Sequence, residues 1–517
     1  MRRGADRAER EAVSRQPNIL LLMADQLAAP ALPCYGHPVV SAPHIGALAA
    51  RSVLFESAYC NSPLCAPSRF AFMTGRLPSR TGAYDNAAEQ PAAIPTFAHG
   101  LRALGYRTCL SGKMHFVGPD QLHGFEERLT TDVYPADFGW TPNWDAPEER
   151  IDWWYHNMES VRQAGVAEAT NQLDFDDETA FHAVRFLRDA ARTSDRRPFM
   201  LTVSFTHPHD PYVARPEHWG RYEGVAIDPP RVPSEPEELR DAHSRRLRRV
   251  AAMEEVAVSA ADVERARRAY YASVSYVDDL VGEILAVLDR LGMAEDTVVL
   301  LTSDHGDMLG ERGLWYKMHF FEWAARVPLL LAGPGLAARR VGAPVSLVDI
   351  LPTLLELGGG AVRPDAGFDV DGSSLLPLAR GEEAGRTVRS EYLAEGALAP
   401  ILMLRRGDLK FVWSAADPPL LFDLASDPDE LLNLAVLPEH AERVARLEAE
   451  VRERWDPDAL HAAVLRSQRE RRLAWKALMN GRYTSWDFQP HTDASRQYAR
   501  NHLDLNDVEA SRRFPPA

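Results

Sequence analysis

Four short apolar segments of the chain each end in side chains that can ligate a metal, bind an anion or transfer a proton. Apolar runs of this length are typical of buried parallel strands. In open α/β sheets, ligands bind beyond the carboxyl ends of such strands, so we expect these side chains to converge on one crevice. The side chains are Asp25 and Gln26, which follow NILLLMA; Lys113 and His115, in YRTCLSGKMH; His207 and His209, in FMLTVSFTHPHD; and Asp304 and His305, which follow TVVLLTS.

A fifth segment, NSPLCAPSRFAFMTG, places Cys65 where the pattern predicts the start of a helix. Pro67 suits the first helical turn, where its missing N–H costs nothing, and Gly75 can end the helix. At a helix N-terminus the free N–H groups and the dipole favour negative charge, which lowers a thiol pKa or helps to hold an anion. The alternative is a small buried cysteine in a turn.

Composition limits the partners and the compartment. The 517 residues include 58 basic and 74 acidic side chains, and the net charge of −16 disfavours nucleic acid or an anionic membrane as the main partner. Four cysteines are too few for a disulfide framework or a CxxC zinc site, which fits a reducing cytoplasm. The longest apolar runs fall short of a membrane span. We therefore expect a cytoplasmic protein with no nucleic-acid or membrane partner.

The order of patterns along the chain predicts an α/β fold with a distinct C-terminal part. Strand-like runs alternate with helical periodicity, as in RAYYASVSYVDDLVGEILAVLDRLG, and from ILMLRRGDLKFVW onward the pattern favours antiparallel hairpins. The arginine-rich stretch 451–475 is interpreted as a solvated helix face. The expected divisions are a flexible extension 1–16, a catalytic domain 17–396, a smaller subdomain 397–455 and a C-terminal helix and tail 456–517.

The elements CAPSR at Cys65–Arg69, SGKMHFVG and SDHGD resemble the type I sulfatases of the alkaline phosphatase superfamily, over residues 17 to 435. The resemblance implies an alkaline-phosphatase-like sandwich with a large mixed, mostly parallel sheet flanked by helices, plus a smaller C-terminal α+β subdomain with an extended tail. In that family a formylglycine-generating enzyme oxidises the cysteine, and hydrated formylglycine is the nucleophile. Pro67, Ser68 and Arg69 would form the recognition signal for this modification.

The resemblance also implies roles for the clustered side chains. Lys113 and Lys317 match lysines that bind sulfate, Arg69 steadies the modified side chain, His115 matches the base that releases sulfate, and His209 matches the leaving-group histidine. His207 is expected further from the chemistry. One divalent ion is implied, and because a neutral amide stands where the family has a second aspartate, we favour Mn²⁺ over Ca²⁺, with Mg²⁺ also allowed. The implied ligands are Asp25, Gln26, Cys65, Asp304 and His305.

Within the family, the chain is similar to the choline-sulfatase subfamily, through YCNSPLCAPSR, GRLPSRTGAYDNAAE and the tail segments GRYTSWDFQP and RNHLDLNDVE. This resemblance implies hydrolysis of choline-O-sulfate to choline and sulfate, and a homo-oligomer, dimer or tetramer, formed through the tail. Aromatic faces attract quaternary ammonium groups. The candidate substrate-binding residues are Trp140, Asn86 and the tail carboxylates Asp504 and Asp507, with Glu391 as a weaker candidate.

Other functions remain open at this level. A phosphonate monoester or phosphodiester hydrolase, or an aryl sulfatase, would keep the scaffold and change the substrate. A catalytically silent anion-binding protein would leave Cys65 unmodified. A cysteine hydrolase that pairs Cys65 with a histidine would leave the two lysines and the metal ligands without a role.

Overall fold

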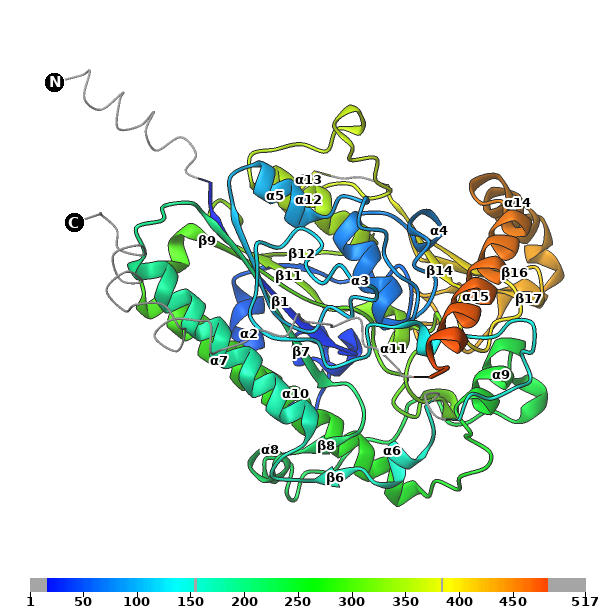
Figure 1. Cartoon of the computed structure of the whole chain (residues 1–517). Helices are drawn as coiled ribbons and strands as arrows, with labels where there is room; N and C mark the ends of the chain where they lie inside the picture. Colours follow the sequence, from blue (N-terminus) through cyan, green and yellow to red (C-terminus); the bar gives the residue numbers. More distant parts are fainter. Residues whose placement is uncertain (1–15, 153–155, 383–384, 482–517) are drawn as a thin grey trace.

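The structure is a computed structural model that describes residues 16–152, 156–382 and 385–481 (Figure 1). Asp504 and Asp507 lie outside the described residues, so their predicted contact with the substrate stays a prediction. None of the helices in the described part of the chain is long and apolar enough to cross a membrane.

A large mixed sheet forms the centre of the molecule, and the four predicted runs are its consecutive strands β9, β1, β7 and β4. These four are parallel to one another, whereas β11 runs antiparallel to both of its neighbours. The strand order is β12 (Arg339–Val341), β2 (Val53–Phe55), β11 (Leu329–Ala332), β9 (Thr297–Ser303), β1 (Asn18–Asp25), β7 (Phe199–Pro208), β4 (Arg107–Gly112) and β5 (Glu127–Arg128).

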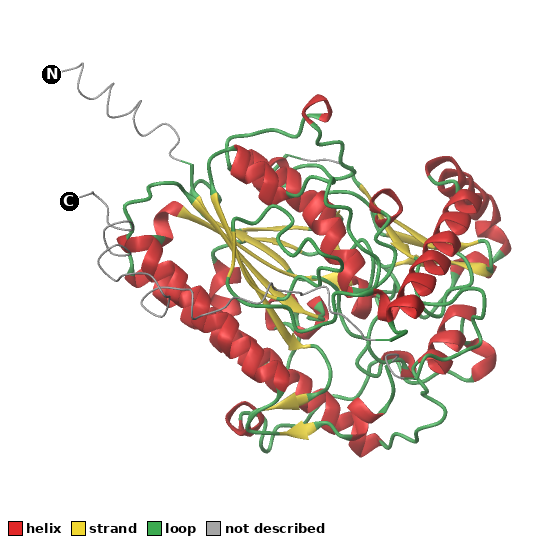
Figure 2. Cartoon of the chain, viewed as in Figure 1, coloured by secondary structure: helices red, strands yellow, loops and turns green. Residues whose placement is uncertain are grey.

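Helices cover both faces of this sheet, which is why its central strands are apolar on both sides. All of β7 and β9 is buried, and so is β1 after its first residue. Helices α7 (Asn171–Arg192) and α10 (Ala260–Arg290) lie on one side (Figures 1 and 2). The other side carries α3 (Cys65–Thr74), α5 (Phe97–Ala103) and α12 (Ile350–Leu357). The predicted α/β sandwich is thereby confirmed.

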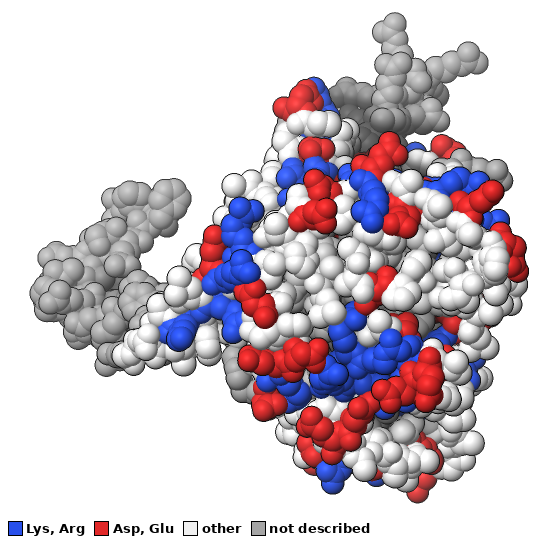
Figure 3. Space-filling model, turned by 90° about the vertical axis from the view of Figure 1, so that its right-hand side faces the viewer, with Lys and Arg blue, Asp and Glu red and all other residues white. Residues whose placement is uncertain are grey.

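The C-terminal part is a second, antiparallel sheet with two helices, as predicted. Its strands pair in sequence order, β14 (Thr387–Tyr392), β15 (Ile401–Arg406), β16 (Leu409–Ser414) and β17 (Asp417–Asp423). Helices α14 (Ala441–Arg454) and α15 (Pro457–Leu478) follow. On the face seen in Figure 3, which is the right-hand side of Figure 1, basic side chains lie beside acidic ones. Strand β14 lies before residue 397 and already belongs to this sheet, and the predicted division at residue 397 stays a prediction.

Further short elements lie between these. The strands are β3 (Ala58–Tyr59), β6 (Gly165–Val166), β8 (Val213–Ala214), β10 (Arg326–Val327) and β13 (Val345–Ser346). The helices are α2 (Pro43–Ala50), α4 (Pro78–Thr81), α6 (Glu159–Arg162), α8 (Pro216–Gly220), α9 (Ala242–Val250), α11 (Glu322–Ala325) and α13 (Leu376–Arg380), and a single 3₁₀ turn, η3 (Phe138–Trp140), carries a predicted site residue.

Candidate active site

Cys65 is the first residue of α3, as its sequence context predicts. Leu64 before it is extended, Pro67 lies in the first turn, and Gly75 ends the helix with a φ of 66°. All ten residues of the helix are buried. The backbone N–H of Ala66 donates to the side-chain oxygen of Asn86 at 3.0 Å, which satisfies one of the free donors of the first turn. The helix therefore presents Cys65 from a fixed, buried position.

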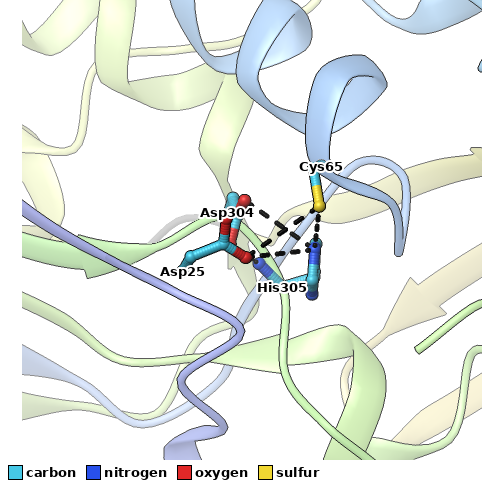
Figure 4. A group of neighbouring side chains, drawn as sticks. All are labelled: Asp25, Cys65, Asp304 and His305. Carbon is cyan, nitrogen blue, oxygen red and sulfur yellow. Dashed lines mark hydrogen bonds and ion pairs between the residues drawn. The ribbon is translucent and has the colours of Figure 1, made fainter. Parts of the chain in front are cut away.

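Four predicted metal ligands surround one point in the interior (Figure 4). Asp25 comes from the end of β1, Cys65 from α3, and Asp304 and His305 directly follow β9, and a ligand atom of each lies within 4.8 Å of the others. The Cys65 sulfur lies 3.1 Å from Nε2 of His305. Two carboxylates, one imidazole and one further ligand suit a hard or borderline divalent ion. Burial lowers the pKa of His305, which keeps the imidazole neutral, the form that binds metal.

Positive side chains hold these carboxylates in place. Arg69, fully buried on α3, donates from Nε to Asp304 at 2.8 Å and from Nη2 to Asp25 at 3.2 Å. Lys113 forms an ion pair with Asp25. Burial opposes ionisation of Asp25, but the charges of Lys113, His209 and Arg69 outweigh it and hold the pKa of that carboxyl well below its usual range. Both aspartates are therefore ionised and ready to bind a cation.

Strands β4 and β7 approach each other closely just before Lys113. Gly112 has a φ of 103°, and a Cβ there would lie 2.0 Å from the carbonyl oxygen of Ser204 on β7. The N–H of Lys113 donates to that same oxygen at 2.9 Å. Only glycine fits such a contact and such a backbone. The glycine of the Gly-Lys element therefore sets where the lysine leaves the sheet.

A second cationic cluster adjoins the first. The Lys317 ammonium donates to Oε1 of Gln26 at 2.6 Å and to Nε2 of His209 at 2.7 Å, and Nε2 of Gln26 donates to Asp307 at 2.7 Å. Because the amide oxygen of Gln26 accepts from a lysine here, its predicted metal-binding role stays a prediction. His207 instead pairs with Asp176 at 2.7 Å. This geometry agrees with its expected place away from the chemistry.

An aromatic wall stands beside the nucleophile position. The His115 ring lies 5.1 Å from the Tyr134 ring and 5.8 Å from the Trp140 ring, between centroids. Both nitrogens of His115 are buried and have no hydrogen-bond partner among the described residues. The Lys113 ammonium lies 4.0 Å from the centre of Tyr134. The wall thus brings predicted catalytic residues next to Trp140, the predicted choline contact.

The Cys65 thiol is acidified, and the charges that acidify it are those of lysines. Burial and the charge of Asp25 raise its pKa, whereas Lys113 and Lys317 lower it, and the result is a pKa of about 6. The side chain at position 65 therefore lies in a field that stabilises negative charge. The same field would attract an anionic ester.

The sequence analysis missed one buried carboxylate. Glu395, in the loop after β14, is 3% exposed, and its Oε2 has no hydrogen-bond partner in the described chain. Burial and the nearby charge of Asp85 raise its pKa to about 7, against the opposing charge of Lys317. Glu391, the named candidate, is instead engaged by Ser79 and by Trp455 Nε1 at 2.6 Å. No spacing in SEYLAEGA distinguishes these two glutamates.

Comparison with known proteins defines the class of protein to which this site belongs. Residues 17–360 match the family model described as sulfatase, so the chain belongs to the sulfatase family and is a sulfuric ester hydrolase. The solved phosphonate monoester hydrolase of Agrobacterium radiobacter superimposes with a TM-score of 0.67 at 23% identity, covering 87% of this chain and 96% of that one, which supports the fold alone.

More specific matches extend over the C-terminal region. Residues 462–514 match the model described as choline sulfatase enzyme C terminal. A curated choline-sulfatase of Rhizobium meliloti (strain 1021) is 52% identical over 97% of this chain and 99% of its own length. Arylsulfatase K of Bos taurus is 28% identical over 98% of this chain and 96% of its own. The resemblance to the choline-sulfatase subfamily is confirmed.

Proposed function

We propose that the protein hydrolyses choline-O-sulfate to choline and sulfate. The observation that carries the proposal is the convergence of Asp25, Asp304, His305 and two lysines on Cys65. A sulfate monoester is anionic at its reacting centre, so this concentration of donors and ligands matches the charge that it must bind. The 52% identity to a choline-sulfatase supports choline as the alcohol.

Each residue of the cluster has a definite task in this mechanism. Lys113 and Lys317 donate hydrogen bonds to sulfate oxygens, and Arg69 keeps the two aspartates oriented. When present, a divalent ion on Asp25, Asp304 and His305 would add positive charge, and formylglycine made from Cys65 would supply an oxygen nucleophile. His115, with two uncommitted nitrogens beside this position, is the base that removes a proton there.

His209 is the proton donor for the departing alcohol. Its Nδ1–H donates to the backbone oxygen of Asp210 at 2.6 Å, which turns Nε2 toward Lys317. The lysine ammonium can only donate, so Nε2 is the acceptor in this bond, and His209 becomes an acid when Nε2 takes up the proton that Lys317 donates. An alkoxide such as that of choline is a poor leaving group and needs this proton.

The choline end requires groups that attract a trimethylammonium. Trp140 offers an aromatic face, and a good cation–π contact contributes roughly 1 to 2 kcal/mol. Glu395 offers a carboxylate oxygen that no described group occupies. Asn86 accepts from the N–H of Ala66, next to Cys65, and is a further proposed contact. Asp504 and Asp507 remain proposed contacts from the tail.

Several finer properties belong to this proposal. We favour Mn²⁺ over Ca²⁺ or Mg²⁺ at the ligand group, and modification of Cys65 by a formylglycine-generating enzyme. Four free cysteines support a reducing cytoplasm as the site of action. The match of residues 462–514 to a choline-sulfatase C-terminal model supports assembly of a homo-oligomer through the tail.

The test is the ratio of kcat/KM for choline-O-sulfate to kcat/KM for an aryl sulfate, on one metal-loaded preparation. Because both substrates need the same modified Cys65, incomplete modification cancels from the ratio. A large ratio supports choline as the substrate. A ratio near or below one with intact aryl turnover would retain the sulfatase and discard choline. Faster turnover of a phosphonate monoester would instead favour that alternative.

A further inference from the structure

Helix α15 is tied to the active-site wall by a buried ion pair. Arg471, 7% exposed, donates from Nη1 and Nη2 to the two carboxylate oxygens of Asp85, at 2.7 and 2.6 Å. Nη1 also donates to Oγ1 of Thr141 at 3.1 Å. The expectation that the arginine-rich stretch is a solvated face is therefore wrong at this residue. The guanidinium joins segments of the chain that are 386 and 330 residues away.

Both partners of Arg471 adjoin residues beside predicted catalytic side chains, because Asn86 binds the backbone next to Cys65 and the Trp140 ring lies 5.8 Å from that of His115. Asp85 precedes Asn86, and its Oδ1 also accepts from the N–H of Ala87 at 3.0 Å, so the carboxylate closes the turn that holds Asn86. Thr141 follows Trp140 and donates to the carbonyl of Phe138 at 2.7 Å, within η3. One guanidinium thus fixes the backbone on either side of the proposed choline pocket.

We propose that Arg471 is a positioning residue that sets substrate specificity, by holding Asn86 and Trp140 at the spacing that a trimethylammonium group requires. The proposal rests on the proposed function and deepens it. It gives helix α15 a role in recognising the alcohol group of the substrate, and this role is separate from the hydrolytic step. A bidentate arginine–carboxylate pair has the rigid geometry that such a role needs.

A positional role and a purely electrostatic role make opposite predictions for Arg471→Met but the same prediction for Asp85→Asn. Arg471→Met removes a positive charge near the ammonium site and, by charge alone, would tighten binding of choline-O-sulfate. Asp85→Asn removes a negative charge and, by charge alone, would weaken it. If Arg471 acts by position, both substitutions loosen the wall, and both raise KM for the choline ester.

The experiment measures kcat and KM for choline-O-sulfate and for an aryl sulfate in Arg471→Met, Asp85→Asn and Arg471→Lys. We expect the kcat/KM ratio of the two substrates to fall about tenfold in the first two, through KM. Arg471→Lys keeps the positive charge but cannot form the two parallel hydrogen bonds of the guanidinium, so we expect the kcat/KM ratio to fall about threefold. If Arg471→Met does not fold, Arg471→Lys decides, because it keeps the positive charge, so a purely electrostatic role predicts no fall in the ratio.

Arg469→Met is the matched control. Arg469 lies on the same helix and binds Asp145 with two bonds of 2.7 and 2.6 Å, but both side chains are exposed, 62% and 45%. Its ratio should stay within twofold of the unmodified chain. Equal losses on both substrates, no loss, or opposite shifts of KM in Arg471→Met and Asp85→Asn would overturn the proposal. The ratio of the unmodified chain tests the proposed function separately.

Discussion

Replacing Glu395 by Gln removes the negative charge that the proposed choline pocket offers while nearly preserving the side-chain volume. A carboxylate and an ammonium about 5 Å apart, in an effective dielectric of about 20, attract each other by about 3 kcal/mol. Every 1.4 kcal/mol corresponds to a factor of about ten in affinity. The amide retains part of the contact, so we expect KM for choline-O-sulfate to rise between about tenfold and about a hundredfold.

The pH dependence gives a second signature of the same group. With a pKa of about 7, Glu395 gains its charge as the pH rises from 6 to 8. The ionised fraction then grows roughly tenfold, so KM for the choline ester should fall by a similar factor over that range. In Glu395→Gln this dependence should disappear.

The assay is again the kcat/KM ratio of choline-O-sulfate to an aryl sulfate, measured at several pH values, because titrations common to both substrates cancel. The raised pKa also means that the folded state holds the proton more tightly than the unfolded chain does. The stability contributed by this proton is complete below pH 4.5 and is lost as the pH rises through about 7. Glu395→Gln should therefore unfold at a higher temperature than the unmodified chain at pH 8. An unchanged ratio at every pH in a folded variant would refute the assignment of Glu395.

Three further outcomes test the hydrolytic centre. Cys65→Ala should abolish turnover of every sulfate ester while circular dichroism stays unchanged, and near-normal turnover would exclude nucleophilic catalysis from position 65. His209→Ala should reduce kcat for choline-O-sulfate by about a hundredfold or more and for an aryl sulfate with a good leaving group far less, and equal losses would remove it from the acid role. A chelator should remove activity, and a divalent metal should restore it, whereas full activity after verified metal removal would contradict the assignment of Asp25 and Asp304.

Much of the site was predictable because the sheet obeys simple rules. Asp25, Lys113, His209 and Asp304 each lie at or just beyond the end of a strand-like run, and four adjacent parallel strands necessarily bring their carboxyl ends together. Cys65 was placed at a helix start by Pro67 and Gly75, whose backbone preferences are local. These features depend only on short segments of the chain, so they can be predicted from the sequence without knowledge of contacts between distant segments.

Other parts of the site depend on contacts between distant segments. Arg471 lies among exposed arginines of α15, and its buried partners Asp85 and Thr141 are 386 and 330 residues earlier in the chain. Glu395 lies in an irregular loop, where neither helical nor strand periodicity indicates which side chain faces inward. The cause of the low Cys65 pKa, two lysines from different segments, likewise requires the folded arrangement.

The contact at Gly112 couples the positions of strands β4 and β7. A methyl group at this position would push against the carbonyl of Ser204, and β4 and β7 would have to separate. Lys113 leaves β4 one residue later, and His209 follows β7, so both would be displaced by the same movement. The effects of a substitution at Gly112 and of substitutions at these two residues should therefore not add. A residue that touches no substrate thus limits how far this active site can vary.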